Sequence, residues 1–141
     1  MATKADFTED EWKTLQKGVT GAGLLVSVSD RDFTDTFGEA GALAKYLGEQ
    51  RQSSDSALIR DLAAVHGSGF GLTASAEKVE GETLDSLRSA ISTLQAKAPD
   101  EVDAYRQVVL GVADHVANAK GGLAPSEEAA LGKIKEAVGA A

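Results

Sequence analysis

The stretch FTEDEW, Phe7 to Trp12, decides how the chain begins to fold. Thr8 is typical of a helix N-cap, and Glu11 follows three residues later, where its side chain can close a capping box. Phe7 precedes the cap and Trp12 lies one turn into the helix, so the two can pack as a hydrophobic staple. The sequence therefore predicts a helix that begins directly after Thr8.

An apolar stripe continues from this start with the three-to-four-residue spacing of one helix face. Its members are Trp12, Leu15, Val19, Ala22 and Val26. Gly18, Gly21 and Gly23 interrupt the segment, and each costs a helix up to about 1 kcal/mol relative to alanine. These glycines either weaken the helix or permit the close approach of a neighbouring helix.

Further stripes of this kind follow along the chain. A second helix is expected from an N-cap at Thr34 to a C′ glycine at Gly48, with Asp35 in its first turn. A third carries Leu58 and Leu62 and is expected to stop at Gly67. Arg51 to Ser56, between the second and third helices, are polar and suit a connection.

The remaining chain predicts helices with proline starts. Residues 75–97 form either one long helix or two short ones divided near Gly81. Pro99 and Pro125 each suit the first position of a helix, and acidic residues follow both. Because no alternating strand pattern exceeds three or four residues, we expect an all-α bundle of about six or seven helices.

Composition sets the class of protein. The 141 residues are 43% hydrophobic and 26% charged, which predicts one globular domain over residues 1–141 with a loose N-terminus at residues 1–6. The net charge of −8, without a Lys/Arg cluster, argues against nucleic acid, and the absence of cysteine excludes disulfides and Cys-type zinc sites.

Hydropathy argues against membrane insertion. The longest apolar stretch, Gly21 to Val28, is far shorter than the roughly 20 residues that span a bilayer. The N-terminus is polar and acidic and lacks the features of a signal peptide, so we expect a cytoplasmic protein. A protein partner is possible on this composition, but the sequence does not identify one.

Sliding the sequence against itself by 90 positions reveals an internal repeat. The five stripe positions listed above then fall on Val102, Tyr105, Val109, Val112 and Val116. Matched pattern and boundaries predict two helix-turn-helix halves, about 8–48 and 98–138, related by a pseudo-twofold axis.

An acidic turn separates the helices of the first half. In SDRDFTDTFGE, Ser29 to Glu39, three aspartates fall within six residues. An EF-hand counted from Asp30 needs Gly at position 6 and Glu at position 12, where the chain has Asp35 and Gly41, so this interpretation fails. Two alternatives stay open: solvated carboxylates with a helix start at Asp35, or a site for Ca²⁺ or another divalent cation. The candidate ligands are Asp30, Asp32, Asp35 and Glu39.

The turn of the second half resembles a known family. AKGGLAPSEEAAL, Ala119 to Leu131, is similar to the A-D-G-x-h-[ST]-P-x-E turn (h apolar) of tellurite-resistance TerB-like proteins, and SDRDFTDTFGE resembles a first copy. The resemblance implies a TerB-like bundle of two related halves that acts as a binding module in metal or stress response. It departs from the pattern where Arg31 replaces Gly and Lys120 replaces Asp, so it implies metal binding at the first turn only.

No enzyme is expected. GSGFG, Gly67 to Gly71, lacks the strand and the GK[ST] of a phosphate-binding loop and is interpreted as an interhelical loop of unassigned role. His66 and His115 have no partner at metal-binding spacing, and His115 is interpreted as a residue at the core boundary. The alternative function is a non-catalytic protein-interaction or structural domain without metal.

Overall fold

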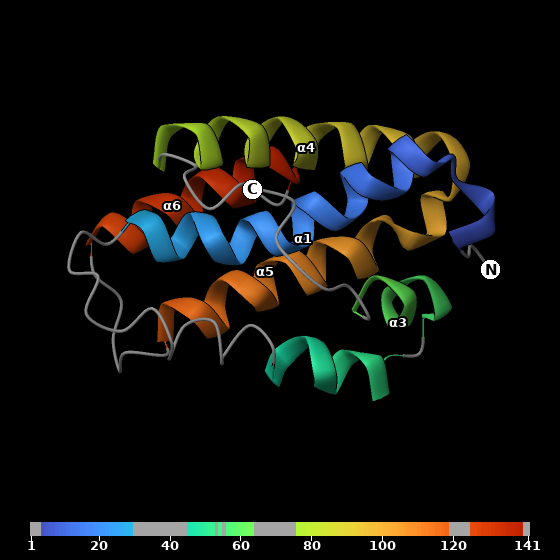
Figure 1. The fold of residues 1–141 in the computed structure, drawn as a ribbon, viewed down its shortest axis with the longest axis horizontal. Coiled ribbons are helices and arrows are strands. Elements are labelled where there is room, and N and C mark those ends of the chain that lie inside the picture. Colours follow the sequence, from blue (N-terminus) through green and yellow to red (C-terminus); the bar gives the residue numbers. More distant parts are fainter. Residues whose placement is uncertain are drawn as a thin grey trace.

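A computed structural model describes residues 4–29, 45–52, 54, 56–63, 76–118 and 125–139 (Figure 1). Across these ranges all regular structure is helical and no strand occurs, which confirms the all-α prediction. They contain six α-helical stretches, namely α1 (Glu9–Ser29), a segment at residues 45–52, α3 (Ala57–Ala63), α4 (Ala76–Lys97), α5 (Val102–Asn118) and α6 (Pro125–Ala137). Two short 3-10 turns, η1 (Lys4–Asp6) and η2 (Pro99–Glu101), precede α1 and α5.

Helix α1 is the central element of the bundle. It packs against α4, α5 and α6, and in Figure 1 it runs between α4 above and α5 below. Its stripe residues are all buried, which places the predicted face in the core. A helix enclosed on several sides must be apolar around much of its circumference. This explains why the middle of α1 is rich in Gly, Ala, Leu and Val.

The start of α1 matches its prediction. The Thr8 amide donates to Glu11 Oε1 at 2.8 Å, and the Glu11 amide donates to Thr8 Oγ1 at 3.2 Å, which completes the capping box. The rings of Phe7 and Trp12 lie 6.3 Å apart between centroids and form the staple. A side-chain cap of this kind stabilises a helix by about 1 kcal/mol.

Two glycines of α1 admit side chains from neighbouring helices. A Cβ on Gly18 would lie 2.2 Å from the hydroxyl of Tyr105 on α5, and a Cβ on Gly21 would lie 2.5 Å from the hydroxyl of Thr83 on α4. The Tyr105 hydroxyl donates to the Leu15 carbonyl at 2.8 Å. Of the two readings left open by the sequence, close approach is therefore the one found at these positions.

At three positions the structure corrects the helix boundaries expected from the sequence, or chooses between two that the sequence left open. Gly48 does not end its helix, because residues 45–52 are helical and Gly48 lies within them; the only described glycine in the left-handed region is Gly139. Gly81 does not divide α4, which is continuous, and a Cβ there would meet no atom within 4 Å. Pro99 opens the 3-10 turn η2 rather than α5, which begins at Val102.

The end of α6 is fixed by α5. Gly139 has a φ of 75°, a conformation that favours glycine, and its amide donates to the Glu136 carbonyl at 3.1 Å. Arg106 on α5 donates from Nε to the Val138 carbonyl at 2.6 Å. The predicted start of α6 at Pro125 is confirmed.

Candidate functional site

The four candidate metal ligands lie outside the residues that the structure describes. These are Asp30, Asp32, Asp35 and Glu39, and the helix start predicted at Thr34 lies there too. The described flank of the acidic turn is the end of α1 at Ser29, directly before Asp30. The prediction of a cation site therefore stays a prediction, and the electrostatics of this helix end bear on it.

The end of α1 carries no positive side chain. Its last turn contains no basic residue, and Leu25 and Val26 near that end are buried. The C-terminus of a helix bears a partial negative charge, so cations there are favoured and carboxylates disfavoured, typically by 0.3–1 kcal/mol each. The aspartates that follow Ser29 thus add negative charge where the helix already concentrates it.

The end of α5 is different. Its last turn contains His115, whose Nδ1 lies 2.9 Å from the Gly111 carbonyl oxygen. Because a carbonyl only accepts, Nδ1 must carry the hydrogen, which fixes the tautomer of the neutral ring. His115 is exposed, so it lies further from the core than the boundary position that the sequence suggested. The next described residue after α5 is Pro125, so Lys120 lies outside the described ranges.

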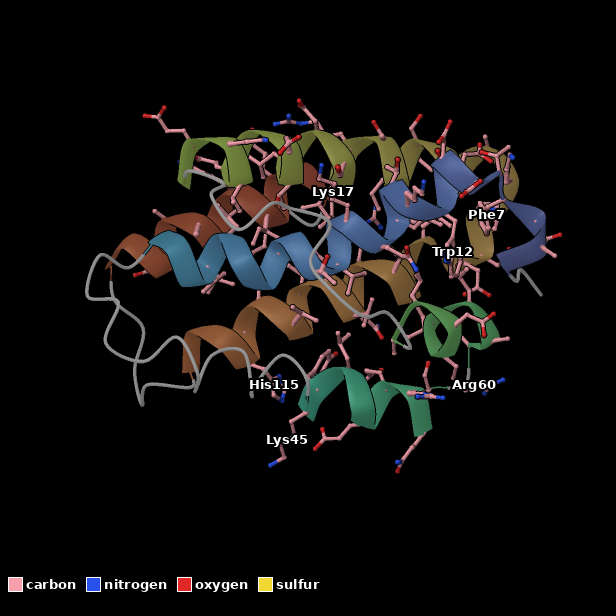
Figure 2. The ribbon with its side chains drawn as sticks, viewed as in Figure 1. Phe7, Trp12, Lys17, Lys45, Arg60 and His115 are labelled. Atoms are coloured by element: carbon pink, nitrogen blue, oxygen red, sulfur yellow. The ribbon has the colours of Figure 1, made fainter. Side chains whose placement is uncertain are left out.

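Tyr46 is a neighbour of His115 that the sequence did not reveal. The two ring centroids lie 4.4 Å apart at an interplanar angle of 39°. The Tyr46 hydroxyl occupies the space over Gly111, where a Cβ would lie 2.0 Å from it. Partial burial, with a smaller effect of the nearby Glu49 carboxylate, raises the pKa of Tyr46. Figure 2 labels His115 on α5 and Lys45 at the start of the segment that carries Tyr46.

The structure describes only some of the other features that the sequence singled out. His66 and the loop Gly67–Gly71 lie outside the described residues. Among the residues that the structure does describe, no group of three or more His, Cys, Asp or Glu side chains is placed to hold a metal ion.

An open groove lies beside the start of α1. It has a volume of about 710 Å³ and is lined by Ala5, Phe7, Thr8, Glu9, Trp12, Lys13 and Gln16. Lys97, at the end of α4, pairs with Glu11 at 2.5 Å and lies 6.0 Å from the Phe7 ring centroid (Figure 2 labels Phe7 and Trp12). The hydrogen bond from Lys97 lowers the pKa of the Glu11 carboxyl. Among the lining residues, Glu9 and Lys13 place both charge signs beside the rings of Phe7 and Trp12.

Comparisons of the chain with protein-family models, with curated proteins and with solved structures find no match. A separate finding concerns membranes: over the described ranges, no helix combines the length and apolarity needed to cross a bilayer.

Proposed function

We propose that this chain is a TerB-like, non-catalytic helical binding module of metal or stress (tellurite) response, and that its acidic turn binds a divalent cation. The ligands would be the carboxylates of Asp30, Asp32, Asp35 and Glu39, completed by water. Ca²⁺ suits such a set because it prefers six to eight oxygen ligands and tolerates irregular geometry.

One observation carries the proposal: the acidic turn directly follows a 21-residue helix that ends without a basic side chain. Charge placed to stabilise α1 would be positive at this end. Three aspartates within six residues instead repel one another and the helix terminus, and a bound cation relieves both repulsions. In a purely structural turn, Asp35 would stabilise the predicted helix start, whereas Asp30 and Asp32 would gain no such stabilisation from a helix dipole.

The packing of α1 on α5 supports the repeat that underlies the resemblance. Leu15 and Tyr105 are equivalent under the 90-residue shift, and they contact each other through the 2.8 Å hydrogen bond. Equivalent residues meet in this way when they lie at a twofold axis. The cross-contacts between the two predicted halves are also alike. Helix α1 of the first half contacts α6 of the second half. Gly111 on α5 of the second half lies against Tyr46 of the segment 45–52.

Calcium titration tests the proposal. Calorimetry and NMR should detect binding at or below millimolar Ca²⁺, with the largest amide shifts at residues 30–39. The double variant Asp30→Asn with Asp32→Asn should abolish it, because both changes remove charge without changing shape. The matched control, Glu77→Gln with Asp100→Asn, removes two exposed carboxylates elsewhere and should bind like the wild type. Absence of any shift at millimolar Ca²⁺ removes the metal role.

The groove beside α1 favours a second candidate function, a protein-interaction domain without metal. Its aromatic floor and mixed charges suit a partner segment with one apolar anchor. In a partner-capture assay, Ala5→Arg would block the groove, whereas Asp30→Asn with Asp32→Asn would leave capture unchanged. The reverse pattern would favour the acidic turn.

A further inference from the structure

The helical segment 45–52 is joined to α5 through Tyr46. The Tyr46 ring packs on His115 and its hydroxyl sits over the backbone at Gly111. Since His115 Nδ1 already donates to the Gly111 carbonyl, Nε2 is the nitrogen that gains the second proton. The ring that covers this joint can thus become a cation without losing its existing hydrogen bond.

We propose that protonation of His115 tightens this joint, so that the segment 45–52 is held more firmly in mild acid than at neutral pH. Histidine is the side chain whose charge ordinarily changes between pH 5 and 8. An imidazolium 4.4 Å from the Tyr46 ring centroid gains a cation–π attraction that the neutral ring lacks. It also lies in the last turn of α5, where the helix terminus favours positive charge.

The charged groups around the joint are of both signs. Of the acidic groups, Glu49 lies near Tyr46 and would attract an imidazolium at His115, whereas Asp114 precedes His115 in α5, where adjacent side chains do not face each other. Lys45 on the same segment as Tyr46 and Lys135 of α6, which lines a groove with Gly111 and Asp114, oppose the imidazolium. Lys45 extends away from α5 in Figure 2, so its opposition is screened by solvent. The stability that the cation–π attraction adds is present while the ring is charged and is lost as the pH rises and the ring deprotonates.

Hydrogen exchange over residues 45–52 tests the proposal. Protection factors, which remove the intrinsic pH dependence of exchange, should be about two- to fivefold higher at pH 5.5 than at pH 8, the range that a cation–π attraction at an exposed site supports. His115→Gln, which keeps a donor but cannot become charged, should make them independent of pH. Equal protection at both pH values in the wild type would overturn the proposal.

Two further variants keep the test specific. Tyr46→Leu retains an apolar contact without a π face, so it should lower protection and remove its dependence on pH. His66→Gln removes the other histidine of the chain and should leave the pH dependence intact. Should His66→Gln abolish it while His115→Gln does not, the proton acts elsewhere and the proposal fails.

Discussion

Helices α1 and α5 each carry a glycine whose missing side chain is replaced by a tyrosine hydroxyl, yet the two contacts differ in depth. At Gly18 the hydroxyl comes from Tyr105, which is fully buried and bonded to the Leu15 carbonyl. At Gly111 it comes from Tyr46, which is partly exposed and packs on His115. A tyrosine over a glycine thus fixes α1 to α5 in the core, whereas at the surface the same kind of contact holds the segment 45–52 on α5 with a ring that is partly open to solvent.

The largest effect is expected for Gly18→Ala. The new methyl would lie 2.2 Å from the Tyr105 hydroxyl and 3.0 Å from a methyl of Leu87, and neither buried side chain has room to move. Overpacking of this kind should lower the free energy of unfolding by about 2–3 kcal/mol, measured by urea denaturation. Gly81→Ala is the matched control, since its methyl meets no atom within 4 Å and should add about 0.5–1 kcal/mol.

The double variant Gly18→Ala with Tyr105→Phe sharpens this explanation. Without the hydroxyl, the nearest Tyr105 atom to the new methyl is the ring carbon at 3.5 Å, an ordinary contact. Tyr105→Phe alone should cost about 1 kcal/mol for the lost hydrogen bond. The double variant should therefore be more stable than the sum of the single effects by at least about 1 kcal/mol. Additive costs would show that the hydroxyl is not the obstacle.

Gly111→Ala should act on the joint more than on the whole molecule. Its methyl would lie 2.0 Å from the Tyr46 hydroxyl, but this ring can swing into solvent. We expect a loss of about 1 kcal/mol in the free energy of unfolding, partly offset by the better helix propensity of alanine. Hydrogen exchange should show protection lost over 45–52 and retained in α1. If Gly111→Ala lowered the free energy of unfolding as much as Gly18→Ala does, the surface contact would be no weaker than the core contact, contrary to the comparison drawn above.

The smallest change is expected for Thr83→Val, at the second crowded glycine of α1. The Thr83 hydroxyl packs against Gly21 and is fully buried, and unlike that of Tyr105 it has no hydrogen-bond partner among the residues that the structure describes. Valine keeps the shape and removes the unpaired hydroxyl, so thermal denaturation should show a gain of about 0.5–1 kcal/mol. Destabilisation would indicate that the hydroxyl is paired in solution.

Features that depend on residues close together in the sequence were predicted correctly. The capping box at Thr8 and Glu11, the buried stripe of α1 and the start of α6 at Pro125 all depend on residues a few positions apart. Gly48 was misjudged because a C′ glycine ends a helix by adopting a left-handed backbone, which Gly48 does not adopt, and sequence alone does not show which glycine will. The same limit applied to Pro99, where a 3-10 turn precedes α5.

Long-range contacts left no sequence signal. Tyr46 meets Gly111 and His115 across more than sixty residues, and no periodicity within either helix announces this pairing. The glycines of α1 suggested close packing, but only the fold shows which side chains enter. The acidic turn remains predicted from its composition, with the basic-free end of α1 as its structural support.

The hydrogen bond between Tyr105 and Leu15 joins residues 90 positions apart, and this separation bears on how the protein is made. A ribosome adds about 5–20 residues each second, so roughly 5–18 s pass between synthesis of the first partner and of the second. During that interval α5 has not yet been synthesised, so the apolar face of α1 that packs on it in the folded protein stays exposed. Chaperones that bind nascent chains would bind this apolar face of α1. If translation ended before α5 was made, the face would stay exposed to solvent.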